Sequence, residues 1–230
     1  MPKTIGIIGG MTPESTTVYY KHIISNYEKQ FEDFGFPEII IYSVSFQRIF
    51  DWANNDNWNA IANHMTEIIH KLNQAGASFA LIAANTPHHV FDIVQSRSPL
   101  PLISIIDSTI EQIQRKGLKK VGLLGTRFTM QKTFFKDGLQ GNEITTLVPS
   151  AEEQENIHRI IFDELARGII SESSHNLFLH IIEKLEEKGA EGIILGCTEL
   201  PLLLREKDCD LPFFDTARIH ADKAFHIAME

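Results

Sequence analysis

One stretch of this sequence occurs twice, and the repeat limits the folds open to the chain more than any other feature. Residues 71–86 match residues 184–199 at a constant offset of 113 positions, the separation of Lys71 from Lys184. Within the repeat, Ala84 corresponds to Cys197. The repeat predicts two halves of similar fold. If these halves face each other, Ala84 and Cys197 lie on opposite walls of one cleft.

Short apolar runs alternate with segments of helical periodicity along the chain. Runs of this kind are typical of buried parallel strands, and the alternation favours helices on both faces of each sheet. The expected strands are residues 4–9, 38–44, 79–83, 101–105, 120–125 and 192–196. The expected helices are residues 13–30, 58–75, 150–165 and 174–188, the third opened by a capping box of Ser150 and Glu153. A second repeat, residues 5–9 against 121–125 at an offset of 116, pairs two of the strands.

These elements predict an α/β fold of two pseudo-symmetric, doubly wound lobes with parallel sheets. Residues 211–215 resemble residues 100–103, which suggests that the last strand and helix cross back to the first lobe. We therefore expect a first lobe of residues 1–103 plus 209–230 and a second lobe of residues 104–208.

Composition excludes several classes of function. The chain has 230 residues, of which 43% are hydrophobic and 22% charged, as in ordinary globular proteins. A net charge of −9 argues against a general nucleic-acid binder. There is no apolar run of membrane-spanning length, and we expect no signal peptide, because the N-terminus leads directly into a predicted strand. Two cysteines predict no disulfide framework and a cytoplasmic protein, and no Cys/His spacing predicts a metal site.

Ligands of open parallel sheets bind beyond the carboxyl ends of the strands. Four segments are expected there: residues 9–12, 84–86, 125–127 and 197–199. Each leads into a predicted helix start, where free N–H groups and the helix dipole favour an anion. Two facing pairs of such ends would suit a small dianion. The glycines at positions 6, 9 and 10 lack the spacing of a dinucleotide-binding loop.

Cys197 is the candidate reactive thiol. A helix N-terminus at this point would lower the pKa of the thiol from its ordinary value of about 8.5. The alternative is an inert cysteine that fills space in an apolar strand. Cys209 lies in a charged turn, Lys207 to Asp210, whose carboxylates would raise its pKa, and we interpret it as incidental.

Other polar residues of the strand ends are candidate ligands for an anion. His88 would serve as a base or an anion ligand, or would simply sit in the first turn of a helix. Arg127, next to Thr126, would clamp a carboxylate in a bidentate pair or remain a solvated surface arginine. Glu199 completes the polar segment that follows Cys197.

Five ordered motifs resemble the aspartate/glutamate racemase superfamily, in particular the amino-acid racemases that act on aspartate and glutamate. The motifs are residues 7–16, 85–88, 125–130, 196–200 and 214–221, and the resemblance runs from Ile5 to about Ala224. It implies two pseudo-symmetric α/β lobes with the active site between them, usually in a homodimer. It also implies catalysis without pyridoxal phosphate, another cofactor or a metal.

The chemistry implied by the resemblance is direct proton transfer at Cα. One cysteine removes the proton from one face and a second cysteine returns it to the other. Cys197 matches the cysteine of the second lobe, and Ala84 occupies the place of the first-lobe cysteine, which some L-selective members replace with threonine. The residues expected around the substrate, a small anionic amino acid, are Met11, Asn85, Thr86 and Thr198, which would stabilise the enolate.

Alanine carries no proton, so Ala84 leaves four alternatives open. A water held by His88 could serve the vacant face, or the enzyme could be slow and one-directional. It could instead run a one-base reaction, like the related arylmalonate decarboxylases, or Ala84 could be a deliberate substitution. A binding protein without turnover is a further alternative. We expect a racemase or epimerase of acidic amino acids with Cys197 as its acid/base.

Overall fold

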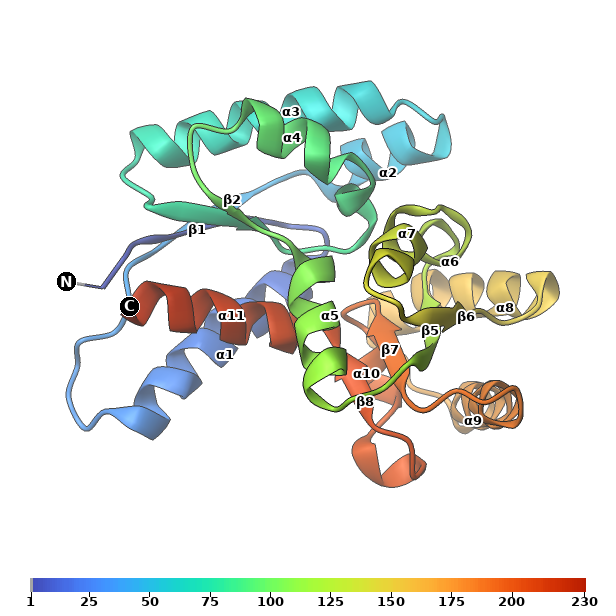
Figure 1. Cartoon of the computed structure of the whole chain (residues 1–230). Helices are drawn as coiled ribbons and strands as arrows, with labels where there is room; N and C mark the ends of the chain where they lie inside the picture. The colour runs from blue at the N-terminus through green and yellow to red at the C-terminus, as the bar shows by residue number, and fades with distance from the viewer. Residues whose placement is uncertain (1) are drawn as a thin grey trace. The chain divides into compact units, whose positions relative to one another are not determined.

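Two four-stranded parallel sheets organise the chain, and the computed structural model describes residues 2–230 (Figure 1). The chain divides into two compact units. The first comprises the chain up to Ser108 together with Ala217–Glu230, and the second comprises Thr109–Thr216. The described part of the chain contains no helix that combines the length and the apolar character of a membrane span.

The first unit is built on the sheet β2-β1-β3-β4. Its strands are β1 (Ile5–Gly9), β2 (Ile39–Ser43), β3 (Phe79–Ile82) and β4 (Leu102–Ile103). Its helices are α1 (Pro13–Gln30), α2 (Phe46–Asn54), α3 (Trp58–Gln74), η1 (Thr86–Val90), α4 (Phe91–Arg97), the start of α5 (Ile105–Arg115) and α11 (Thr216–Met229). Apolar residues of β1 and β3 pack with α1 and α11 on one face of the sheet, and α3 covers the other face (Figure 1).

The second unit is built on the sheet β6-β5-β7-β8, in the same order. Its strands are β5 (Lys120–Gly125), β6 (Thr145–Leu147), β7 (Ile193–Gly196) and β8 (Phe213–Asp215). Its further elements are α6 (Arg127–Gln131), α7 (Phe134–Gly141), α8 (Ala151–Asp163), η2 (Leu165–Arg167), α9 (Glu172–Glu187), α10 (Leu200–Leu203) and η3 (Glu206–Asp208). Buried residues of β5, β7, α8 and α9 form its apolar core.

The strand registers agree with the internal repeat. Gly6 of β1 lies opposite Ala80 of β3, and Gly122 of β5 lies opposite Ile193 of β7. These pairs are related by the offsets of 116 and 113 that the sequence shows. The two units therefore share both strand order and strand register, which confirms the predicted α/β fold with two similar halves.

The prediction that residues 209–230 all belong to the first lobe is wrong. Strand β8 pairs in parallel with β7, with Phe213 opposite Ile193, so it completes the second sheet. Only α11 returns to the first unit, and the first stretch of that unit extends to Ser108 rather than to residue 103. Residues 211–215 resemble residues 100–103 because β8 and β4 occupy equivalent edge positions in two separate sheets. The resemblance does not mean that the two strands belong to one sheet.

The expected strands and helices are all present, with ends that differ by a few residues. Elements without a prediction include α2, α5, α7 and β6. The three residues of β6 are too few to show a periodic pattern.

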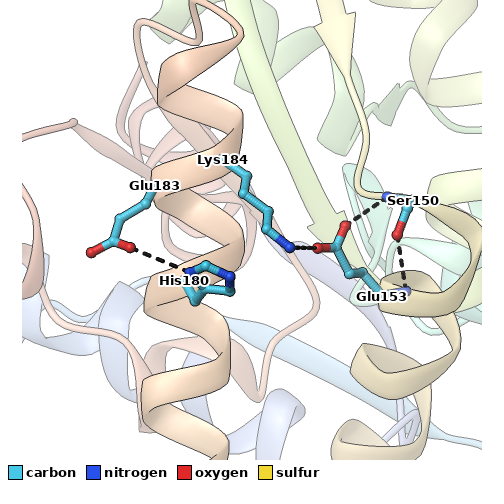
Figure 2. Close-up of polar contacts among 5 residues, drawn as sticks. All are labelled: Ser150, Glu153, His180, Glu183 and Lys184. Atoms are coloured by element: carbon cyan, nitrogen blue, oxygen red, sulfur yellow. Dashed lines mark hydrogen bonds and ion pairs between the residues drawn. The ribbon is translucent and has the colours of Figure 1, made fainter.

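The predicted capping box opens α8 and also joins it to α9 (Figure 2). Glu153 Oε2 accepts from the backbone N–H of Ser150 at 2.8 Å, and Ser150 Oγ accepts from the N–H of Glu153 at 3.4 Å. Lys184 of α9 donates to Glu153 Oε1 at 2.8 Å. The Lys184 hydrogen bond is the main reason that the pKa of Glu153 is lowered to about 2.

We predict that Glu153→Gln lowers the free energy of unfolding at pH 7 by about 1–2 kcal/mol, because it removes a charged cap and an inter-helix ion pair. The stabilisation is complete above the ordinary glutamate pKa of about 4.3 and is lost as the pH falls through about 2. Urea denaturation at pH 7, 4 and 2 measures it. Glu152→Gln, in the same first turn, is the matched control; equal stability of the two variants at pH 7 would contradict the prediction.

Candidate functional site

The shared register makes Ala84 and Cys197 equivalent positions at the carboxyl ends of β3 and β7. In each unit this strand pairs with the first strand of the same sheet. The loops that follow two adjacent parallel strands emerge side by side at the carboxyl ends of those strands. Residues 10–12 and 84–86 therefore lie at one edge of the first sheet, and residues 126–127 and 197–199 lie at the corresponding edge of the second.

The loop after β1 is held closely against its surroundings. Gly10 has a φ of +88°, and a Cβ there would lie 2.5 Å from the carbonyl oxygen of Val44, so only glycine fits. Its N–H donates to Thr16 Oγ1 at 2.7 Å. Thr12 caps α1, its side chain accepting from the N–H of Ser15. Met11, between these two anchors, is buried.

The loop after β3 is fixed through its carbonyl groups. Ser15 Oγ of α1 donates to the carbonyl of Ala83 at 3.3 Å. His88 Nδ1 lies 2.8 Å from the carbonyl oxygen of Ala84, and the N–H of Ile105 donates to His88 Nε2 at 3.1 Å. Because Nε2 accepts and a carbonyl can only accept, Nδ1 carries the proton and donates it to Ala84. Ser15 was not among the residues predicted from the sequence.

This arrangement does not support His88 as a base or an anion ligand. Both ring nitrogens are occupied by backbone groups of the first unit, and the side chain is 3% exposed. Burial lowers the pKa of His88 to about 4, so the ring is neutral at pH 7. His88 instead holds the backbone at Ala84. Asn85 is also buried, and Thr86, which is partly exposed, begins η1.

A second buried histidine lies behind the first. His220 Nε2 is 2.9 Å from the carbonyl oxygen of Ile103, and Tyr19 Oη is 2.9 Å from His220 Nδ1. The His220 and His88 rings are 5.9 Å apart. Burial lowers the pKa of His220 to about 3. In the sequence, His220 is recognisable only as a histidine among apolar residues of a helix. Its partners, Tyr19 and Ile103, are distant in the chain and could not be predicted.

We predict that both histidines make stability fall on acidification. The unfolded chain binds their protons below a pKa of about 6.5, whereas the folded chain resists protonation to about pH 4 and 3. The free energy of unfolding should therefore decline as the pH falls from about 6.5 towards 4, by at most about 1.4 kcal/mol per pH unit for each histidine.

Urea denaturation between pH 7.5 and 5 tests this on three chains. His88→Gln should be less stable at pH 7.5 and should show a shallower decline than the unchanged chain. The exposed His70→Gln is the control and should keep the full decline. An unchanged slope in His88→Gln would refute the assignment.

In the second unit, the residues of the loop after β5 form hydrogen bonds with other residues of the same unit. Thr126 caps α6 by accepting from the N–H of Thr129 at 3.4 Å. The Arg127 guanidinium donates to Glu155 of α8 at 2.9 Å, and both side chains are substantially exposed. The backbone N–H of Arg127 donates to His158. This geometry favours the surface-arginine interpretation of Arg127 over a clamp for a substrate carboxylate.

The loop after β7 joins the thiol to a buried carboxylate. Cys197 Sγ donates to Glu199 Oε2 at 3.0 Å, and Thr198 Oγ1 donates to the same oxygen at 2.8 Å. Cys197 is 9% exposed and Glu199 is 6% exposed. The sequence predicts Glu199 among the ligands of an anion but does not predict its contact with the thiol, although the two residues lie only two positions apart.

The predicted lowering of the Cys197 pKa is wrong. Burial raises the pKa well above its ordinary value, and the charge and hydrogen bond of Glu199 raise it further. Backbone N–H groups of Glu199 and Thr198 act in the opposite direction with less effect. The helix expected to lower the pKa is α10, which has four residues and begins only at Leu200. In this structure Cys197 is a protonated thiol, a proton donor.

Cys209 has different surroundings. It is half-buried, its thiol donates to the carbonyl of Leu211 at 3.6 Å, and it packs beside the apolar core of the second unit. Its pKa is raised, as predicted, but burial is the main cause and the nearby carboxylates contribute less. Nothing in these contacts links Cys209 to the strand ends.

Comparisons with known proteins cover nearly the whole chain. The family model described as Asp/Glu/Hydantoin racemase matches residues 8–224. A crystal structure of an aspartate racemase homologue from Pyrococcus horikoshii OT3 is 43% identical, with a TM-score of 0.88 and 100% of both chains covered. One from Yersinia pestis, provisionally assigned as an Asp/Glu racemase, is 39% identical, with a TM-score of 0.93 and coverage of 99% of this chain and 100% of that one. Broad specificity amino-acid racemase RacX of Bacillus subtilis (strain 168) is 25% identical over 226 residues, covering 93% of this chain and 92% of that protein.

Proposed function

Because the chain belongs to the Asp/Glu/hydantoin racemase family, we propose that it is a cofactor-independent racemase or epimerase of acidic amino acids in which Cys197 transfers the Cα proton. The observation that carries the proposal is the buried thiol at the end of β7, whose proton is held by a hydrogen bond to Glu199. We further propose that the protein acts in the cytoplasm as a homodimer.

The proposed proton transfer balances at a single carbon. In one direction the Cys197 S–H bond breaks, its proton forms a Cα–H bond on one face of a planar enolate, and a thiolate remains. In the other direction the thiolate removes that proton and the electron pair of the Cα–H bond enters the enolate. The backbone N–H groups of Thr198 and Glu199 favour the thiolate, so both states of the sulfur have partners.

The proposed substrate class is aspartate and glutamate. The name of the Pyrococcus relative supports aspartate, and the name of RacX supports testing a wider range of amino acids. In this proposal Cys197 acts on one face of the substrate Cα, and position 84 is the one that would carry the acid/base for the other face. The residues proposed to surround the substrate are Met11, Asn85, Thr86, Thr126 and Thr198.

Ala84 makes the proposed reaction one-sided. A two-base racemase needs a proton carrier on each face of Cα, and alanine carries none. His88 is poorly suited to replace it, because both of its ring nitrogens bind backbone groups. The same alanine favours a second candidate function, a single-thiol decarboxylase or isomerase of a dicarboxylate, in which Cys197 protonates an enolate from one face.

We predict that the chain exchanges the Cα proton of one enantiomer faster than it forms the other. The measurement is NMR in D₂O, with chiral chromatography, starting separately from L- and D-aspartate and L- and D-glutamate. Cys197→Ala should abolish exchange, and Cys209→Ala, the matched thiol control, should retain it. Equally fast interconversion in both directions would contradict the one-sided site. Absence of exchange with every substrate would reject the racemase and favour the decarboxylase or a binding protein.

We predict that Ala84→Cys raises the rate of racemisation by about 10²–10⁴-fold, the range typical of general acid–base groups. Ala84→Ser is the matched control, because it adds a similar small side chain whose hydroxyl is a far weaker acid. Position 84 is buried, so overpacking is expected to cost about 1–3 kcal/mol, which thermal denaturation would measure. No gain in a folded Ala84→Cys chain would count against the two-sided geometry.

A further inference from the structure

We infer that Glu199 is a positioning residue for Cys197: its carboxylate keeps the proton on the sulfur and fixes the direction of the S–H bond. The inference rests on the proton-transfer role proposed for Cys197. It assigns Glu199 to the thiol rather than to the substrate.

The geometry around Glu199 Oε2 supports this assignment. This oxygen accepts from the Cys197 thiol at 3.0 Å and from the Thr198 hydroxyl at 2.8 Å. A carboxylate oxygen in these contacts is the acceptor, so the thiol and hydroxyl protons both point towards it. Glu199 is 6% exposed and stands at the N-terminal boundary of α10, so its side chain is held in place by its surroundings. The S–H bond therefore has one defined direction.

The electrostatics act in the same sense. Cys197 belongs to the apolar cluster of the second unit, and Glu199 is the charged group that acts on it there. A negative charge beside a buried thiol disfavours a second negative charge on the sulfur. Two backbone N–H groups, of Thr198 and Glu199, partly offset this and stabilise the thiolate after the proton leaves. At rest Cys197 is therefore the acid, and the thiolate that removes a Cα proton is the less populated form of the same sulfur.

The internal repeat supplies an independent comparison. The offset that relates Ala84 to Cys197 also relates Thr86 to Glu199. The unit that has a thiol at this position therefore has a carboxylate two residues later, whereas the unit that has alanine there has the neutral Thr86. In the first unit the backbone carbonyl of Ala84 is fixed, by His88, whereas in the second unit the thiol side chain is fixed.

The test measures the ionisation of Cys197 without any substrate. In a Cys209→Ala background, the rate of alkylation by iodoacetamide is followed from pH 6 to 11. Replacement of Glu199 by Gln removes the charge and should lower the pH midpoint by about one unit, which makes alkylation about tenfold faster at pH 7.5. Thr198→Val, which removes the other donor, and the exposed Glu206→Gln should keep the high midpoint of Cys197.

A midpoint that stays the same or rises in Glu199→Gln overturns the inference. If that variant does not fold, Glu199→Asp, which draws the carboxylate back from the sulfur, takes its place in the same alkylation series: a lowered midpoint supports the inference, and an unchanged or raised midpoint overturns it. In the folded variant, the pH profile of Cα exchange should shift downward with the midpoint. If the alkylation midpoint falls but the chain shows no Cα exchange, the effect of Glu199 on the thiol is upheld and the proposed function is rejected. If Cα exchange occurs but the midpoint does not fall, the proposed function is upheld and the role of Glu199 is rejected.

Discussion

Parallel pairing of β1 with β3, and of β5 with β7, is the constraint on which the rest of the structure depends. Parallel neighbours require crossover connections, which place helices on the faces of each sheet and bring successive strand ends to one edge. Because both pairs have the same register, each sheet edge presents equivalent positions. The contrast between Ala84 and Cys197 is a difference of residue at one structural position.

The two equivalent positions are stabilised by different chemistry. At Ala84, neutral histidine and serine side chains bind backbone carbonyls, and a second buried histidine lies behind them. These contacts define where the chain runs but provide no group that exchanges a proton. At Cys197, the contact is between side chains and includes a charge. The hydrogen bonds thus fix a backbone carbonyl at Ala84 and a thiol side chain at Cys197.

A buried thiol beside a carboxylate is a weak source of thiolate and a well-directed proton donor. This differs from a reactive cysteine exposed at a helix N-terminus, where the thiolate is the resting form. The short α10 provides little helix dipole, so burial and Glu199 dominate. In the proposed function, removal of a Cα proton is therefore the demanding step. It needs Cys197 as a thiolate, the form that burial and Glu199 disfavour.

Local patterns in the sequence determined the strands other than β6, the main helices and the capping box at Ser150, because each depends on residues close together in the chain. The repeat was visible by direct comparison of the two halves of the sequence. They also identified Cys197 as the residue of interest. Tertiary structure decided the sheet to which β8 belongs, since equivalent edge strands look alike in sequence. It also decided the tautomer of His88 and the direction of the Cys197 pKa shift. These depend on burial and on which way a side chain points, and neither is set by the spacing of residues along the chain.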